Sequence, residues 1–198
     1  HAGDIITRQD IVDIIEKKKK DFPIVIDEAM KVTSYGSLLK VCKDLLHEKI
    51  PIIDMLTIIE AVADIAEFTK VPEILLEHVR AKLYRLITQK YKDTDGVLHI
   101  ITIKPELEQQ FIGKLQEHHG VSQLMISIAE INNLVTKTKK LLDDIEAKGF
   151  SKITMVVDPV LRKRISEIYE KFGLQVSVLS HAELDSKANF AIEGTLEF

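Results

Sequence analysis

The chain has 198 residues, of which 45% are hydrophobic and 29% charged, and its formal net charge is −4. This length and composition are ordinary for a folded protein with one large or two small domains and well-buried cores. The negative charge argues against a general nucleic-acid binder, although it leaves room for a local basic patch. With a single cysteine, Cys42, no intramolecular disulfide can form, which fits a reducing compartment.

No segment has the pattern of a membrane span. The longest apolar stretch, residues 50–66, is interrupted by Asp54, Glu60 and Asp64, whereas a transmembrane helix needs about 18 or more apolar residues. We also find no signal-peptide pattern. Because the sequence begins with His1 rather than methionine, we expect it to be a fragment of a longer protein.

The first part of the chain is expected to be helical. Thr7 and Asp10 have the spacing of a capping box, in which each side chain accepts a hydrogen bond from the other residue's backbone N–H. They predict a helix that ends in the basic run 17–20. A second helix is expected over about 37–47, with Cys42 in its apolar stripe as a core residue rather than a nucleophile.

Two prolines mark the next helices. Pro51 predicts a short extended link, because the residue before a proline avoids the α conformation. Asp54 is the expected N-cap of a helix over about 54–67. Pro72 opens a further helix that runs to about residue 87. Residues 88–91 either finish that helix or form a strand, and the turn signal at 95–96 marks a domain boundary.

From residue 97 the pattern changes to alternating strands and helices. Strands are expected at 97–103, 153–157 and 176–179, with an edge strand over 190–198 whose Phe190 and Ile192 face inward. Pro105 opens a helix that includes Leu115, a long helix follows over 128–145, and Asp158 and Pro159 cap and begin another. The unit from 153 to 179 implies a right-handed parallel crossover. The expected fold class is therefore mixed α and α/β: a helical, winged-helix-like subdomain (1–95), then a small α/β sandwich with a mostly parallel sheet (96–198).

The candidates for chemistry are few. His118 and His119 are adjacent, which on a helix turns their side chains apart, so we interpret them as a polar helix end. Asp158 follows a buried strand at the edge where open α/β sheets bind ligands, and Arg162 comes soon after it. An anion or enzyme site at Asp158 can be imagined, but the carboxylate would repel an anion, and no serine, histidine or second carboxylate is placed to work with it.

A winged-helix nucleic-acid binder is the alternative function. Helices 54–67 and 72–87 could form a helix-turn-helix with Arg80, Lys82 and Arg85 toward DNA. Recognition helices, however, contact bases mainly through their N-terminal residues, which here are Glu73 and Glu77. The change from acidic to basic residues along the helix is explained more simply by its dipole.

Several motifs, taken in order, are similar to the cytoplasmic tail of a known family. They are ITRQDI (6–11), IPIIDMLTIIEAVAD (50–64), TIKPELEQ (102–109), VVDPVLRKRI (156–165) and VLSHAEL (178–184). This series resembles the FlhA/InvA/MxiA family, the export-gate proteins of flagellar and virulence type III secretion. The absence of virulence-specific features favours the flagellar branch.

The resemblance implies a non-enzymatic component of a protein export gate, with no cofactor, metal or nucleic acid. The full-length protein would be anchored in the bacterial inner membrane. Its cytoplasmic tail would form a ring with neighbouring copies and dock export chaperones with their cargo and export ATPase components. The present chain would hold the end of a preceding subdomain's helix, then the helical and α/β subdomains. Candidate partner or ring contacts are Arg8, Ile53, Glu60 and Arg162, and Ile53 departs from the basic residue that family members often carry there.

Overall fold

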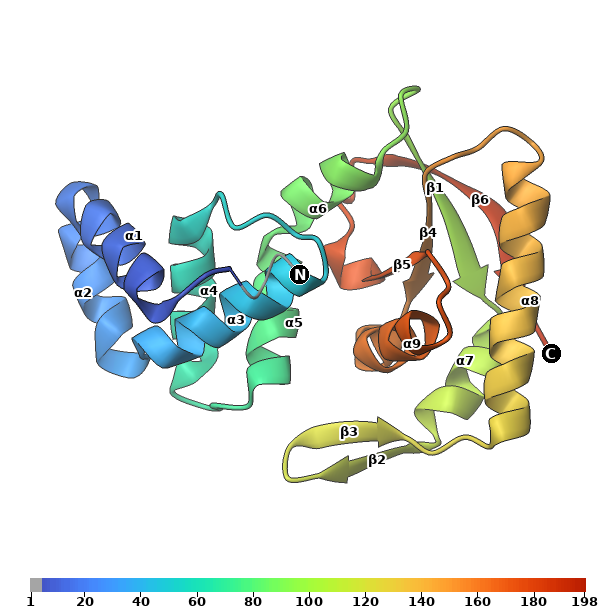
Figure 1. Ribbon diagram of the computed structural model, residues 1–198, viewed down its shortest axis with the longest axis horizontal. Helices are drawn as coiled ribbons and strands as arrows, with labels where there is room; N and C mark the ends of the chain where they lie inside the picture. Colours follow the sequence, from blue (N-terminus) through green and yellow to red (C-terminus); the bar gives the residue numbers. More distant parts are fainter. Residues whose placement is uncertain (1–4) are drawn as a thin grey trace. The chain divides into compact units, whose positions relative to one another are not determined.

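The computed structural model describes residues 5–198, and the chain divides into two compact units between Leu83 and Tyr84. The first unit contains α1 (Arg8–Asp21), α2 (Pro23–Val32), α3 (Tyr35–His47), α4 (Met55–Ala66) and α5 (Pro72–Lys82) (Figure 1). The second contains α6 (Tyr84–Tyr91), β1 (Val97–Ile103), α7 (Pro105–Ile112), β2 (Leu115–His118), β3 (Val121–Leu124), α8 (Ile128–Glu146), β4 (Ile153–Val157), α9 (Pro159–Lys171), β5 (Ser177–Ser180), the 3-10 helix η2 (His181–Glu183) and β6 (Asn189–Leu196). The predicted fold class, a helical part followed by a parallel α/β part, is confirmed.

The division lies earlier in the chain than the expected boundary at 95/96. The reason is that α6 packs on η2 of the second unit. The hydroxyl of Thr88 donates to the carbonyl of Glu183 over 3.2 Å and accepts from the N–H of Asp185 over 2.9 Å. Residues 88–91 therefore finish a helix of the second unit, and the alternative of a strand there is wrong.

Helix α1 begins as its sequence predicts. Thr7 Oγ1 accepts from the Asp10 N–H over 3.2 Å, and Asp10 Oδ2 accepts from the Thr7 N–H over 2.7 Å. The hydrogen bonds from Thr7 lower the pKa of Asp10. Helix α2 was not predicted: Pro23 begins it, and the exposed ion pair between Lys19 and Asp27 joins it to α1 over 2.9 Å.

The link between α3 and α4 has the predicted form. The chain leaves α3 through Lys49, whose φ of 63° is left-handed, and the Ile50 N–H returns to the Leu45 carbonyl over 2.8 Å. A proline soon after such a cap is common, because it cannot continue the helix, and Pro51 holds that place. Asp54 then caps α4 by accepting from the Thr57 N–H over 3.2 Å.

Cys42 is fully buried in α3, as expected of a core residue. Burial raises the pKa of its thiol to about 12, so the reactive thiolate is scarce near neutral pH. The expected single helix from Pro72 to residue 87 is instead two helices. The Leu83 N–H is shared between the carbonyls of Val79 and Arg80, at 3.0 and 3.1 Å, which tightens the last turn of α5 and ends it.

The second unit is organised around a four-stranded sheet in the order β5-β4-β1-β6. All three strand pairs are parallel. Alternate residues of the strands face one core, to which α7, α8 and α9 contribute. Its buried members are Ile101, Ile103, Leu107, Phe111, Leu134, Ile145, Met155, Val157, Leu161, Ile165, Tyr169, Val178 and Leu196.

The region after α7 differs from the prediction. Helix α7 ends at Ile112, and Leu115 starts β2 of an antiparallel hairpin. His119 and Gly120 form its turn with φ values of 53° and 80°. Two successive residues of positive φ are the signature of a type I′ hairpin turn, in which the second residue is often glycine. The two histidines therefore lie at a hairpin tip and not at a helix end.

Edge strand β6 is confirmed, but the inward orientation predicted for Phe190 and Ile192 is wrong. Leu196 faces the core, whereas Phe190 and Ile192 are 58% and 57% exposed. The cause is a bulge: Ile100 pairs with Ile192 and the next residue, Ile101, with Gly194. Glu193 is the extra residue, and one inserted residue reverses the face of every side chain before it.

Two aromatic residues lie near the end of helix α9, and Tyr169, not Phe172, is the one that packs into the core. Phe172 is 45% exposed, and Tyr169 is buried in its place. The Tyr169 hydroxyl lies 2.8 Å from the Thr138 hydroxyl of α8 and 2.9 Å from the Met155 sulfur of β4. These contacts join two helices and the sheet through one polar group inside the core.

We predict that Tyr169→Phe lowers the free energy of unfolding by about 1–3 kcal/mol, because the buried Thr138 hydroxyl loses its partner. Adding Thr138→Val to the same chain should recover part of the loss, since apolar replacement of both partners is nearly neutral. Urea unfolding followed by circular dichroism measures both. Equal stability of the wild type and the single variant would contradict the role given to this hydrogen bond.

Candidate functional site

The carboxyl edge of the sheet is the first place to look for a site, since ligands of open α/β sheets bind there. Asp158 follows β4 and caps α9, with Oδ1 accepting from the Val160 N–H over 3.0 Å. Its own N–H donates to Glu108 Oε2 over 3.1 Å. Its Oδ2 lies 3.9 Å from Nε2 of His181, at the end of β5. Asp158 and Pro159 thus have the structural roles predicted for them.

Sequence reasoning missed His181 as a neighbour of Asp158. The available signal was topological, because the carboxyl ends of adjacent parallel strands meet at one edge of a sheet. The residue before His181, Ser180, is only 2% exposed, and its side chain takes part in the capping box of η2. A buried hydroxyl used in this way is poorly placed to act as a nucleophile.

Arg162 is the positive charge that the sequence placed near this edge, and the structure buries it. Its Nε lies 3.5 Å from Glu183 Oε1, and each side chain is 1% exposed. Glu183 Oε2 also accepts from the Ser180 N–H over 3.2 Å. The prediction of Arg162 as a partner or ring contact is therefore wrong for this structure: its charge is used inside the fold, because a buried arginine requires a paired carboxylate.

The titratable side chains that meet at Asp158 are those of Glu108 and His181, and the nearby Ser180 is buried. Within residues 5–198, no cluster of three or more His, Cys, Asp or Glu side chains could hold a metal ion. The arrangement at Asp158 is one of helix capping and internal pairing.

Two of the three basic residues considered for DNA binding, Arg80 and Lys82, lie near carboxylates, while Arg85 is exposed. Arg80 is 1% exposed and its Nη1 lies 2.7 Å from Glu48 Oε2, while Lys82 Nζ lies 4.0 Å from Asp64 Oδ2. Residues 5–83 contain no strand, so this part of the chain provides no β-hairpin wing. The geometry does not support the winged-helix nucleic-acid binder.

The remaining candidate contacts lie on the surface of the first unit. Ile53, in the link before α4, is 78% exposed, and Arg8 and Glu60 are exposed on α1 and α4. Phe68, just after α4, is 84% exposed. Large apolar side chains in open solvent mark surfaces that other proteins can cover when they form a patch. Of the four candidate contact residues, Arg8, Ile53 and Glu60 are thus accessible to a partner.

No helix among the described residues combines the length and apolar character that crossing a bilayer requires.

Comparison with known proteins gives consistent matches along the chain. A model of the FHIPEP family matches residues 1–189. The flagellar biosynthesis protein FlhA of Helicobacter pylori is 38% identical over 197 residues, which cover 99% of this chain and 27% of that protein. FlhA of Borreliella burgdorferi is 32% identical over 161 residues, covering 78% and 22%. The chain thus spans about a quarter of the length of these relatives.

Solved structures agree in fold. The nonameric SctV-C from EPEC has a TM-score of 0.86 at 19% identity, covering 98% of this chain and 58% of that one. The C-terminal domain of InvA has a TM-score of 0.86 at 22% identity, covering 97% and 58%. The CdsV protein of Chlamydia pneumoniae, solved in complex with CdsO, has a TM-score of 0.84 at 20% identity, covering 98% and 57%.

We predict that Arg162→Met destabilises the second unit by about 3–5 kcal/mol, because it leaves Glu183 as a buried unpaired charge. Lys171→Met, on the exposed surface of the same helix, is the control and should change stability by less than about 0.5 kcal/mol. Thermal and urea unfolding measure the difference. If both variants were equally stable, the ion pair would not be a structural element of the fold.

Proposed function

Because the chain belongs to the FHIPEP family, we propose that it is a docking and ring-forming part of a flagellar protein export gate. The family resemblance expected from the sequence motifs is confirmed by the family match and by the FlhA relatives. The observation that carries the proposal is the identity of 38% to a flagellar biosynthesis protein over 99% of this chain. The proposed function has no catalytic step and no cofactor.

The proposed partners are neighbouring copies of the same chain, flagellar export chaperones with their cargo, and components of the export ATPase complex. Two comparisons support this assignment by analogy. A structural neighbour, SctV-C, forms a nonamer, and another, CdsV, has been solved bound to a second protein, CdsO. We place the full-length protein in the bacterial inner membrane, with this part of the chain on the cytoplasmic face.

The physical features of the chain are consistent with docking. Arg80 and Arg162 are enclosed with carboxylate partners, whereas Ile53 and Phe68 of the first unit remain in solvent. Burial of exposed apolar area is the main favourable term in most protein association. We therefore assign the contacts between copies to the first unit, with Ile53 as a central residue and Arg8 and Glu60 as further contacts.

We predict that Ile53→Asp in the full-length protein weakens ring formation, because it places a charge where an apolar side chain would be covered. Ile128→Asp is the matched control: Ile128 has the same exposure, 78%, but lies on α8 of the second unit. Electron microscopy of the purified rings and sedimentation velocity measure assembly, and thermal unfolding checks that both variants fold. Intact rings in the Ile53 variant would refute this assignment of the contact.

A further inference from the structure

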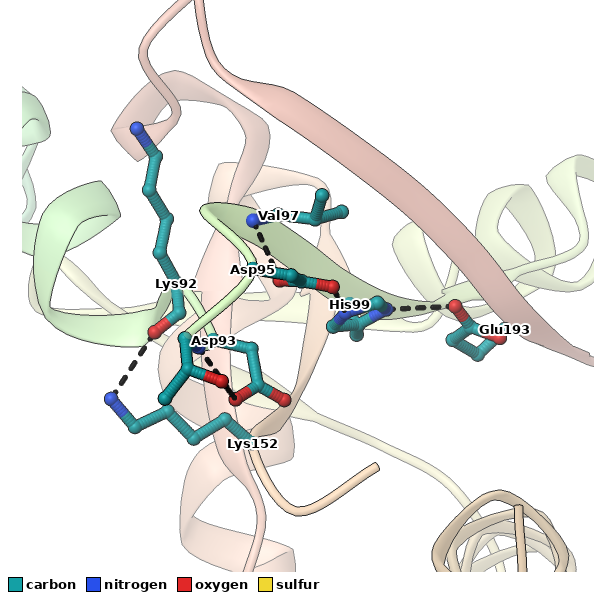
Figure 2. Close-up of polar contacts among 8 residues, drawn as sticks. Lys92, Asp93, Asp95, Val97, His99, Lys152 and Glu193 are labelled. Atoms are coloured by element: carbon teal, nitrogen blue, oxygen red, sulfur yellow. Dashed lines mark hydrogen bonds and ion pairs between the residues drawn. The ribbon is translucent and has the colours of Figure 1, made fainter. Parts of the chain in front are cut away.

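His99 is a buried histidine of β1 that the proposed docking function does not use. It is 4% exposed, and each of its ring nitrogens faces a carboxylate (Figure 2). Nδ1 lies 2.8 Å from Glu193 Oε1 of β6, and Nε2 lies 3.0 Å from Asp95 Oδ2 in the turn before β1. Figure 2 shows the ring between these two acids. Local sequence patterns could not predict this arrangement, because Glu193 lies 94 residues from His99 along the chain.

This geometry has a definite protonation requirement. A neutral imidazole carries one N–H donor and one acceptor nitrogen, while an ionised carboxylate only accepts. A neutral His99 would therefore place a lone pair against one of the two carboxylate oxygens. Only the imidazolium, with a proton on each nitrogen, satisfies both contacts at once.

The surroundings hold both acids in place. Asp95 Oδ1 accepts from the Val97 N–H over 2.9 Å, which fixes its other oxygen toward the ring. Glu193 is the extra residue of the β6 bulge, and its side chain is 16% exposed. The bulge turns Glu193 to the same side of the sheet as His99 instead of letting it alternate to the other side. The ring of Phe150 covers His99, with 4.4 Å between ring centroids.

Other charged groups near this end of the sheet include Lys92, Asp93 and Lys152, which Figure 2 also shows. Lys152 Nζ donates to the Lys92 carbonyl over 3.1 Å, and Asp93 Oδ1 accepts from the Thr94 N–H over 2.7 Å. Their hydrogen bonds thus go to the backbone of the turn and not to the ring. The charges bonded to His99 are the carboxylates of Asp95 and Glu193.

We propose that His99 is a proton-dependent latch that fastens edge strand β6 and the turn before β1 through Glu193 and Asp95. Strand β6 pairs with β1 along one side and is the last strand of the sheet. Loss of the His99 proton leaves two carboxylates facing a ring that can donate to only one of them. The bulge then loses a charged hydrogen bond on its inner side, and β6 opens more readily.

The direction of the pH effect follows from linkage. Burial disfavours the charged ring, but the hydrogen bonds that His99 donates to Glu193 and Asp95, together with their negative charges, outweigh it, and the pKa of His99 is raised above its usual value of 6.5. A raised folded-state pKa contributes stability that is complete below the unfolded pKa and is lost as pH rises through the folded value. The latch is therefore closed below the raised His99 pKa and opens as the pH rises through it.

The exposed side chains of β6 connect the protonation of His99 to the protein surface. Phe190 and Ile192 are more than half exposed on the strand that the latch fastens. When β6 is closed, these two side chains are held in fixed positions on the sheet. When it opens, they become mobile together, so any protein that contacts them senses the protonation of His99.

The test is a pH titration of the intact chain by NMR. Both ring nitrogens of His99 should carry protons below its titration midpoint, and that midpoint should lie above pH 6.5, the ordinary histidine value. Glu193→Gln should lower that titration midpoint. Lys152→Met, which removes a nearby charge that donates to the Lys92 carbonyl instead, should leave the midpoint almost unchanged.

Hydrogen exchange of the β6 amides gives a second readout. Above the His99 midpoint, protection corrected for intrinsic exchange should fall by up to about tenfold per pH unit, which is the limit for linkage to one proton. His99→Gln should reduce the protection of the β6 amides and abolish its pH dependence. If His99→Gln folds poorly, Glu193→Gln replaces it in this experiment. A His99 titration midpoint at or below pH 6.5, or equal pH dependence in wild type and His99→Gln, would overturn the proposal.

Discussion

The ion pair between Arg162 and Glu183 is the interaction on which the second unit depends. The Glu183 carboxylate pairs with Arg162 of α9 and accepts a hydrogen bond from the Ser180 N–H at the end of β5. Its backbone carbonyl accepts a hydrogen bond from the Thr88 hydroxyl of α6. One buried residue therefore joins two helices to the sheet. A buried arginine is tolerated only with its partner in place. Since Thr88 of α6 bonds to that same partner, Glu183, the contact also explains why α6 belongs to the second unit.

The same constraint limits what the surface can do. Arg80 is paired with Glu48 in the first unit as Arg162 is paired in the second, so two cations that suggested anion or DNA binding are not offered to solvent. At the carboxyl edge of the sheet, Asp158 is committed to capping α9. Outward apolar residues such as Ile53 remain, and these suit association with other proteins.

Local signals predicted much of the fold and little of what lies between distant segments. The Thr7–Asp10 box, the Asp54 cap and the Asp158–Pro159 helix start depend on neighbours in sequence and were predicted correctly. The side chains of β6 that face inward were not predicted correctly, because their side of the sheet depends on a bulge opposite Ile100 and Ile101. The burial of Arg162 escaped prediction for the same reason: its partner lies on another element, and a cation one turn into a helix has the same local pattern whether buried or exposed.

A chimera shows whether residues 1–198 act as part of a flagellar export gate. Residues 1–198 would replace the matching segment of Helicobacter pylori FlhA, the relative at 38% identity, in a strain that lacks its own gene. Export of filament protein into the medium is then measured, with membrane fractions probed for the chimera. We expect the chimera to export clearly more filament protein than the deletion strain does. A chimera that is present at the membrane at normal levels and exports nothing would contradict it.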